Sequence, residues 1–434
     1  MNNLGVRQIN DEHTQIPMNK VTYRQSSKFT FRECKIGDHL FSEKLPSTRN
    51  DLDARRDFYL SYLSKELQHE TAPGKKFTYV DLFCGGGGMS LGVQNAAKFF
   101  GYNPRLACAV DLDENALKLV QAHFKPLIAR AKSVEDLMKY AIDLSGNSDQ
   151  YISKPQILDT QLAQFKGRID LLIGGPPCQG HSNLNNKTRR FDPRNLLYLA
   201  MPSMAIALDI PKIIIENVQT ITKAKENVVK ITKSLLKAYG YSVEEKVIDC
   251  SLIGVAQTRQ RHFLVARKGT QPNLGKMLNS FKSDPLSFDE VCGTLPSLPA
   301  GDWGIVNDTA KMSDANSDRI NYLHDNNIFD LPNHERPVCH QEGTSYSSVY
   351  GRINGSLPMT TITTGFASPG RGRYVHPHER RCLSIREAGR IQGFPDWYWR
   401  DVQSLGVKRG HLHKVVGDAV PSLVAYPILA SLLF

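Results

Sequence analysis

A run of four glycines between an apolar stretch and an amphipathic stretch constrains this chain more than any other feature. Residues 77–83 read FTYVDLF, residues 85–88 are all glycine, and residues 89–100 have a helical pattern. Glycines at a strand-to-helix turn let a ligand approach the backbone, and the helix N-terminus favours a negative group there. A strict G-x-G-x-x-G motif is absent, because Ser90 or Leu91 stands where its third glycine would be, which argues against a dinucleotide. We interpret the turn as a nucleoside-binding loop, with a turn that serves only packing as the alternative.

Apolar runs and helical segments alternate up to residue 267. Strand-like runs occupy residues 105–113, 168–175, 211–218 and 261–267, and the first of them is followed by a helical pattern at 115–124. Such alternation predicts an α/β fold with a mainly parallel sheet that helices cover on both faces.

The composition and the apolar pattern of the sequence differ outside residues 77–267. Residues 1–75 are polar and charged apart from a possible helix at 51–68, so we interpret them as an extension of unknown role. Between 268 and about 370, Gly, Pro, Asn, Asp and Ser predominate, which predicts a second domain of loops and short elements. Regular patterns return at 384–395 and at 420–434, where an apolar C-terminal helix is expected.

Charge and cysteine usage limit the partners and the compartment. The formal net charge of +11 favours a polyanion or an anionic surface as partner. The eight cysteines occur singly without a C-x-x-C pair, so no metal site is expected. The polar N-terminus lacks a secretion signal and no apolar run is long enough for a bilayer, which predicts a protein of a reducing, cytoplasmic compartment without a membrane partner.

A cysteine follows the strand-like run 168–175 in the sequence GGPPCQGHS. A side chain at the carboxyl end of a parallel strand lies in the crevice where such sheets bind ligands. Prolines restrict the approach of the chain, and glycines leave room for a ring. We interpret Cys178 as a nucleophile, although buried structural cysteines are common.

Two further signals are weak when each is taken alone. Glu216 ends the run 211–218, and Arg259 and Arg261 lie on one side of an extended segment. Together with a thiolate they suit one reaction. A thiolate adds to carbon 6 of cytosine and makes carbon 5 reactive, a carboxyl group stabilises charge at N3, and arginines bind the base oxygen or a phosphate.

The order of several sequence blocks carries a family resemblance. The blocks DLFCGGGG, PPCQG, DPRNLL, ENV, QTRQR, RCLSIREAGRIQGFPD and VVGDAVP occur in the order seen in DNA cytosine-5 methyltransferases, and the match covers about residues 77–267 and 356–434. The chain resembles this family, particularly its bacterial restriction-modification members. The resemblance implies a Rossmann-like methyltransferase sheet with a smaller target-recognition domain, S-adenosylmethionine as methyl donor and S-adenosylhomocysteine as product.

Carried over position by position, the resemblance implies roles for individual residues. Cys178 resembles the nucleophile, Glu216 the N3 partner, and Arg259 and Arg261 the arginines near the base. The residues expected to line the donor site are Asp81, Phe83, Gly85, Gly87, Asp111, Leu112, Pro177, Leu197, Asp418 and Ala419. Those expected to contact DNA are Gln179, Ser182, Arg189, Arg190, Arg371 and Arg373.

The segment 366–381 is expected to be a basic strip that faces phosphates, with a solvated charged surface as the alternative. Asp418 stands where the family usually has Asn, and Ser133 with Val134 is the nearest candidate for the family's third block, followed by an insertion. The expected domains are an N-terminal extension (1–75), a catalytic domain (76–267 with 408–434) and a target-recognition domain (268–407). Their expected partner is double-stranded DNA, with the target cytosine flipped out of the duplex. We expect a monomer, with an endonuclease of the same site as a further partner.

Three alternatives stay open from sequence alone. The same scaffold could methylate cytosine in tRNA. A catalytically silent relative would only bind DNA, although Cys178, Glu216 and Arg261 are all present. A nucleotide-dependent oxidoreductase is disfavoured by the missing third glycine and does not explain PPCQG.

Overall fold

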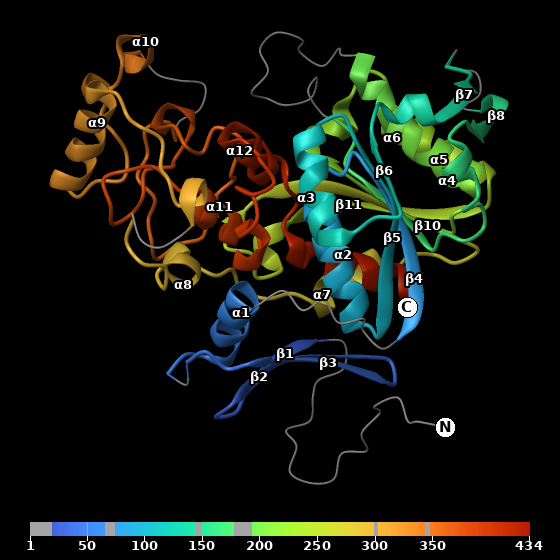
Figure 1. The fold of residues 1–434 in the computed structure, drawn as a ribbon, viewed down its shortest axis with the longest axis horizontal. Helices are drawn as coiled ribbons and strands as arrows, with labels where there is room; N and C mark the ends of the chain where they lie inside the picture. The colour runs from blue at the N-terminus through green and yellow to red at the C-terminus, as the bar shows by residue number, and fades with distance from the viewer. Residues whose placement is uncertain are drawn as a thin grey trace.

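A seven-stranded sheet forms the centre of the larger part of the molecule (Figure 1). The computed structural model describes residues 20–49, 51–65, 74–144, 150–177, 193–298, 303–342 and 348–434. In sheet order the strands are β11 (Tyr241–Asp249), β13 (Gln260–Lys268), β10 (Lys212–Val218), β9 (Leu171–Gly174), β4 (Lys75–Leu82), β5 (Tyr102–Asp111) and β6 (Ile128–Ala131). The strands from β10 to β6 are parallel, whereas β13 runs antiparallel to β10 and β11. The predicted mainly parallel α/β sheet is therefore confirmed.

Helices cover both faces of this sheet because successive side chains of a strand point to opposite faces. Tyr79 and Ile173 belong to one apolar core, whereas their neighbours Val80 and Leu172 belong to the other. The first core includes side chains of α2 (Gly88–Phe99), α3 (Glu114–Phe124), α7 (Leu274–Ser280) and α13 (Ala425–Leu433). The second includes side chains of α4 (Thr160–Ala163), α5 (Ala200–Leu208) and α6 (Val228–Ala238).

The C-terminal segment is a core element. It consists of α12 (Arg409–Asp418), the 3-10 turn η9 (Ser422–Val424) and α13, the helix predicted at 420–434. Among the described residues, the stretch 409–433 is long and apolar enough to cross a membrane by length and composition, yet 94% of its most apolar window is buried inside the fold. Burial of this kind is typical of a core helix.

The N-terminal region holds more structure than its sequence suggests. The helix expected at 51–68 is present as α1 (Ala54–Ser64), but the antiparallel strands β1 (Val21–Gln25), β2 (Phe29–Ile36) and β3 (His39–Pro46) were not expected. Charged residues conceal the strand pattern, because Arg32 occupies an inward position of β2 and is 4% exposed. We refer to residues 20–65 as the N-terminal unit, which lies below the main sheet in Figure 1.

The region from 268 to 407 consists of short elements joined by loops, as predicted. Besides α7 they are α8 (Phe288–Cys292), η5 (Gly304–Val306), α9 (Asp314–Asp325), η6 (Asn333–Glu335), α10 (Val338–Gln341), β14 (Met359–Thr360), η7 (Pro369–Arg371), α11 (Ile385–Ile391) and η8 (Asp396–Trp399). A small separate core forms around α9 and includes Ile320, Leu323 and Tyr350. Since α7 belongs to the core of the main sheet, the domain boundary at 268 stays a prediction.

The expected insertion after Ser133 and Val134 is a hairpin. Ser133 caps η1 (Val134–Leu137), and the antiparallel strands β7 (Met138–Ile142) and β8 (Tyr151–Ile157) follow before the chain enters β9. Three further 3-10 turns lie in the catalytic region, namely η2 (Pro193–Leu199), η3 (Gln219–Lys223) and η4 (Cys250–Leu252).

A buried ion cluster stabilises the segment that contains α11 and η8. Asp396 accepts hydrogen bonds from Arg386 at 2.7 Å and from Arg390 at 2.7 and 2.9 Å, and all three residues are buried. Both guanidinium groups hold the pKa of Asp396 below its usual value, against the effect of burial. Removal of one member of this cluster would leave the opposite charge buried without its partner, which destabilises the fold.

We predict that Asp396→Ala lowers the free energy of unfolding by about 3–5 kcal/mol, because it leaves buried guanidinium groups without their carboxylate. Urea unfolding followed by circular dichroism measures this change. The control is Asp325→Ala, which removes the exposed partner of Arg380 and should leave the unfolding midpoint unchanged. Equal midpoints for both variants would contradict the prediction.

Candidate active site

A cavity of about 410 Å³ lies at the carboxyl ends of strands β4, β5, β9 and β10. Every residue expected to line the donor site lines this cavity, with the exception of Gly87. Glu216, Arg259 and Arg261 line the same cavity. The structure therefore brings these residues together in one cavity, although they are up to 338 positions apart in the chain, from Asp81 to Ala419.

The glycine loop forms one wall of the cavity. Gly85 has a φ of +50° and Gly87 a φ of +78°, values that residues other than glycine adopt rarely. A Cβ atom on Gly85 would meet no atom within 4 Å, whereas one on Gly87 would lie 2.5 Å from the ring of Phe124. Gly87 therefore serves the packing of the loop, and Gly85 keeps space open beside it.

Acidic side chains hold the loop in place. Asp111, at the end of β5, accepts hydrogen bonds from the backbone N–H groups of Gly85 and Asp113, each at 2.8 Å. Asp81 is 1% exposed and accepts a 2.6 Å hydrogen bond from the hydroxyl of Ser90, and burial raises its pKa to about 7. Asp111 thus faces the cavity with a fixed carboxylate, while Asp81 orients the first turn of α2.

An ion pair forms the opposite wall. Oε1 of Glu216, near the end of β10, lies 3.0 Å from Nε of Arg261 on the neighbouring strand β13. Both side chains are largely buried, with 11% and 15% exposed. Burial raises the pKa of Glu216, and Arg261 and Arg259 oppose that effect. A Cβ on Gly175 would lie 3.2 Å from Oε2 of Glu216, so a larger residue would crowd this carboxyl group.

Arg259 has a different environment from Arg261. Its guanidinium is 1% exposed and donates to the carbonyl oxygens of Ile362 at 2.7 Å and Gly417 at 3.2 Å. Burial, with the neighbouring Arg261, lowers its pKa to about 9. Arg259 therefore joins three segments of the chain at the edge of the cavity.

Strands β12 (Gln257–Thr258) and β14 pair in parallel at this junction. The side chain of Gln257 accepts from the backbone N–H of Ile362 at 2.8 Å and donates to the side chain of Gln392 at 3.0 Å. Gln392 in turn donates to the carbonyl of Val416 at 2.7 Å. Residues of QTRQR, IQGFP and VVGDAVP thus form one buried network.

Sequence reasoning missed the role of Asn217. Its side-chain amide donates to the carbonyl of Pro176 at 3.0 Å, and its oxygen accepts from the backbone N–H of Val218 at 2.9 Å. These bonds hold the Gly-Pro-Pro approach to Cys178 against the end of β10. The signal was present in the block ENV, because a buried amide beside a strand-end acid requires partners.

Lys414 is another cavity residue that the sequence did not indicate. It lies 2.6 Å from Asp418, one helical turn further along α12. Burial lowers the pKa of Lys414, but Asp418, with Asp111 and Asp113, outweighs that effect and raises the pKa. The aspartate that replaces the family's usual asparagine is therefore paired with a cation within its own helix.

The segment after Pro177, which the sequence predicts to carry the nucleophile, lies outside the described residues. Cys178, Gln179, Ser182, Arg189 and Arg190 lie outside the described residues. In the part of the chain that the structure describes, Cys84 lines the cavity. Burial, with Asp81 and Asp111, raises its pKa well above the usual value, which makes Cys84 a poor thiolate nucleophile.

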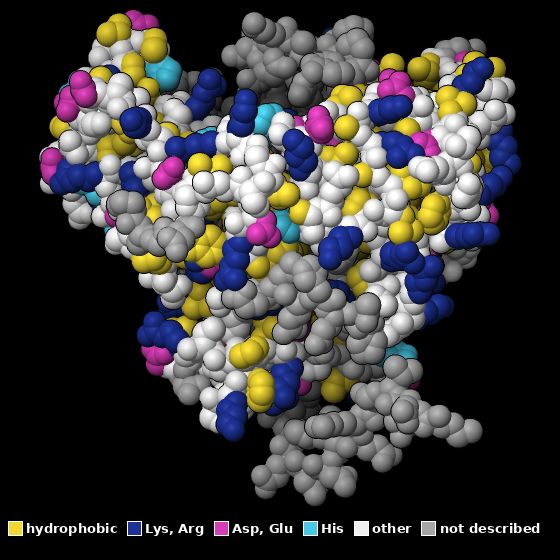
Figure 2. All heavy atoms as spheres, in the orientation of Figure 1, with side chains coloured by type: hydrophobic (Ala, Val, Ile, Leu, Met, Phe, Trp, Pro, Cys, Tyr) yellow, Lys and Arg dark blue, Asp and Glu magenta, His cyan; other side chains and the backbone are white. Residues whose placement is uncertain are grey.

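The predicted basic strip at 366–381 is largely engaged within the chain. Its basic side chains contact carboxyl groups in the pairs Arg373–Asp330, Arg380–Asp325, Arg381–Glu387, His376–Glu387 and His378–Asp289. On the face drawn in Figure 2, Asp and Glu side chains likewise lie among the Lys and Arg side chains. Arg371 is exposed. DNA contact by Arg371 and Arg373 stays a prediction, and for Arg373 the intrachain pair is the established contact.

The model of the C-5 cytosine-specific DNA methylase family matches residues 77–433. The chain belongs to this family. It is 37% identical over 349 residues to the type II methyltransferase M1.BsuMI of Bacillus subtilis, covering 80% of this chain and 78% of that protein. It is 28% identical over 370 residues to the type II methyltransferase M1.HphI of Haemophilus parahaemolyticus, covering 82% and 86% of the two chains.

The fold is also similar to that of solved structures. The Dnmt2 methyltransferase of S. pombe superposes with a TM-score of 0.53 at 16% sequence identity, covering 83% of this chain and 98% of that one. The family assignment confirms the expected DNA (cytosine-5)-methyltransferase activity. It also disfavours the tRNA and oxidoreductase alternatives.

Proposed function

We propose that the cavity holds S-adenosylmethionine and a flipped-out cytosine side by side, and that Cys178 carries the covalent chemistry. The observation that supports this most directly is the shared cavity. The glycine loop and Asp111 form one side of it, and the Glu216–Arg261 pair forms the other. A donor and an acceptor bound to these two walls would meet inside one enclosed space.

The residues on the first wall fit the methyl donor. Gly85 leaves open space at the loop, Asp111 presents a carboxylate suited to ribose hydroxyls, and Phe83 and Leu112 border the same cavity and could sandwich an adenine. Leu112 is 73% exposed, so its side chain is available to a ligand. When bound, the donor supplies an electrophilic methyl group.

The residues on the second wall suit cytosine. In the proposal, the Cys178 thiolate forms a bond to carbon 6, and the displaced electron pair moves onto the ring. Glu216 donates its proton to N3, which leaves a neutral enamine that is nucleophilic at carbon 5. After methylation, the proton on carbon 5 passes to a water molecule, the thiolate leaves carbon 6, and the Glu216 carboxylate takes back the proton from N3, which together restore the neutral aromatic ring.

Arg261 has two functions in the proposed reaction. Its charge holds the carboxyl group of Glu216 in position through the 3.0 Å contact. Its remaining N–H groups can donate to the base oxygen O2 or to a phosphate. Arg259 is committed to main-chain carbonyls and therefore supports the wall and adds positive potential.

We further propose that the substrate is duplex DNA, from which the cytosine is flipped into the cavity. The region from 268 to 407 would read the sequence, and the net charge of +11 supports binding to the phosphates. The similarity to type II methyltransferases supports a bacterial restriction-modification enzyme. We propose in addition that it acts in the cytoplasm as a monomer and that an endonuclease recognises the same site.

We predict that Cys178→Ala abolishes methyl transfer and leaves DNA affinity within about twofold, because the thiolate is required for chemistry and not for phosphate contacts. Bisulfite sequencing of DNA from cells that express each variant reports both the modified carbon and its sequence context. The matched control is Cys339→Ala, which removes an exposed cysteine of the 268–407 region. Methylation by Cys178→Ala at the level of the control would refute the nucleophile assignment.

The raised pKa of Glu216 predicts a decline of kcat on the alkaline side of the pH profile. Because the protonated carboxyl group is the proposed donor to N3, kcat should fall as the pH rises through the pKa of Glu216. Glu216→Gln should lower kcat by about 100-fold and remove this decline, since an amide stays neutral. Single-turnover rates between about pH 5 and pH 9 test this. An unchanged alkaline decline in Glu216→Gln would assign it to another group.

A further inference from the structure

Tyr62 of the N-terminal unit connects two segments of the catalytic domain. Its side chain is 4% exposed, and its hydroxyl accepts a hydrogen bond from Nδ2 of Asn95 at 3.0 Å. The same hydroxyl donates to the carbonyl oxygen of Gly393 at 3.1 Å. Asn95 lies on α2, the helix that begins directly after the glycine loop, and Gly393 lies in the turn that follows α11. Tyr62 therefore fixes the position of this helix relative to this turn.

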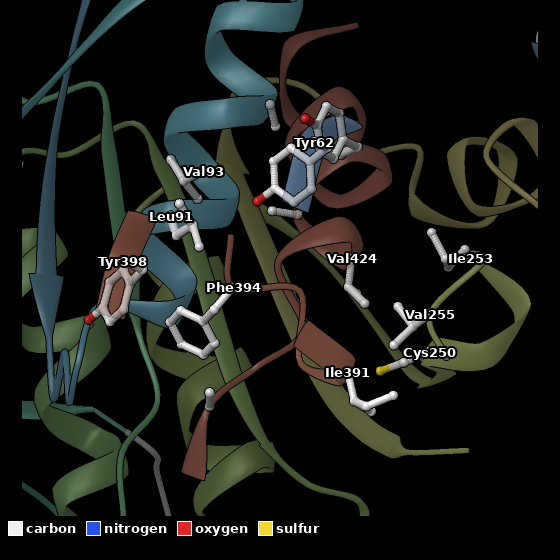
Figure 3. Close-up of a cluster of buried hydrophobic side chains, with 14 of the residues drawn as sticks. Tyr62, Leu91, Val93, Cys250, Ile253, Val255, Ile391, Phe394, Tyr398 and Val424 are labelled. Carbon is white, nitrogen blue, oxygen red and sulfur yellow. The ribbon is translucent and has the colours of Figure 1, made fainter. Parts of the chain in front are cut away.

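The turn at Gly393 leads directly to the wall of the cavity. A Cβ on Gly88 would lie 3.3 Å from the ring of Phe394, so this ring packs on the start of α2. The hydroxyl of Tyr398 donates to the carbonyl oxygen of Gly86, which lines the cavity. Figure 3 shows Tyr62, Phe394 and Tyr398 in one buried cluster with side chains of α2. The segment that Tyr62 contacts therefore packs against the glycine loop through Phe394 and donates a hydrogen bond to its backbone through Tyr398.

Close packing against three aromatic rings restricts the position of the Tyr398 side chain. Its ring centroid lies 4.4 Å from that of His123, 4.7 Å from that of Phe394 and 4.8 Å from that of Trp399. Packing on three sides leaves the hydroxyl little freedom. A shift of the turn at Gly393 would therefore move the Gly86 carbonyl with it.

The N-terminal unit is anchored to the same core at a second point. The buried guanidinium of Arg32 pairs with Glu43 at 2.5 Å and lies 3.8 Å from the ring centroid of Tyr426 on α13. It also lies 5.1 Å from the ring centroid of Phe99, at the end of α2. A buried cation between aromatic rings is stable only in this arrangement, because separation would leave its partners unsatisfied. The unit is therefore a fixed support of α2 and not a loose appendage.

We propose that the N-terminal unit is a positioning element for methyl-donor binding, in which Tyr62 and Tyr398 set the position of Gly86 in the cavity wall. The inference rests on the proposed function of the cavity as the donor site. Residues 20–65 lie outside the segment that matches the family model, so the chain adds this support to the family's own donor site. Neither tyrosine contacts the reacting atoms in this account, and both act through the glycine loop.

The test compares Tyr62→Phe and Tyr398→Phe, which remove a hydroxyl and keep the ring. Calorimetric titration with S-adenosylhomocysteine should show affinity weakened by about fivefold to tenfold, on the scale of the one buried hydrogen bond that Tyr398→Phe removes and the two that Tyr62→Phe removes. Affinity for duplex DNA should stay within about twofold, and KM for the methyl donor should rise while kcat is retained. The matched control is Ser61→Ala, which removes a 2.7 Å hydrogen bond to the Pro46 carbonyl inside the N-terminal unit. It should leave S-adenosylhomocysteine affinity unchanged.

Three results would overturn parts of this account, and they are distinguishable. Tyrosine variants that bind S-adenosylhomocysteine as tightly as the unsubstituted chain would overturn the positioning role alone. The same holds if Ser61→Ala weakens binding as much as they do, since the effect would then be general loosening of the unit. Failure of the unsubstituted chain to bind S-adenosylhomocysteine would instead overturn the proposed donor site, and the positioning role with it.

Discussion

The buried ion pair between Glu216 and Arg261 is the interaction on which the rest of the site depends. A carboxyl group that is 11% exposed would be costly in an apolar wall, and the 3.0 Å contact with the guanidinium offsets that cost. Both residues lie near strand ends, and the antiparallel pairing of β10 with β13 brings these ends together. In this antiparallel register Val218 of β10 stands opposite Arg261 of β13, so Arg261 lies beside the end of β10 that carries Glu216.

A second layer of buried polar contacts holds this pair in place. Arg259 and Gln257 bind main-chain groups of the segment around Ile362, and Gln392 extends the network to Val416. The segments involved come from the catalytic region, from the short-element region and from the C-terminal region. Loss of one hydrogen bond in such a buried network leaves its partner group unsatisfied at a high cost in free energy. The geometry of the cavity is therefore coupled to the docking of the region expected to read DNA.

The N-terminal unit supports the donor side of the cavity in a similar way, through buried hydrogen bonds between distant segments of the chain. Its contacts reach the glycine loop through the turn at Gly393 and through Tyr398. In the proposed function, Tyr62 supports the donor side of the cavity and Arg259 the base side. The two supports meet in the turn after α11, where Gln392 binds Gln257 and the adjacent Gly393 binds Tyr62.

Much of the fold and the site could be predicted from local patterns. Apolar runs predicted five of the seven strands of the main sheet, whereas the edge strands β6 and β11 were not expected. Strand-end positions indicated Asp111 and Glu216, because parallel strands present their carboxyl ends at one edge. The strands of the N-terminal unit were missed, since Arg32 points inward and breaks the apolar alternation. Asn217 and Lys414 were missed because their roles depend on Pro176 and Asp418, contacts that no periodicity encodes. The intrachain pairs of the basic strip could not be predicted, because the carboxylates that pair with Arg373 and Arg380 lie about 40 to 60 residues earlier in the chain.

The central claim is that the cavity supports covalent attack by Cys178 on a cytosine ring. The most direct measurement incubates the chain and its methyl donor with a duplex in which 5-fluorocytosine replaces the target cytosine, at the site that bisulfite sequencing identifies. Fluorine at carbon 5 blocks the final proton loss, so the account predicts a protein–DNA adduct that survives a denaturing gel and maps to the peptide containing Cys178. Absence of an adduct, or an adduct on the cavity cysteine Cys84, would contradict it.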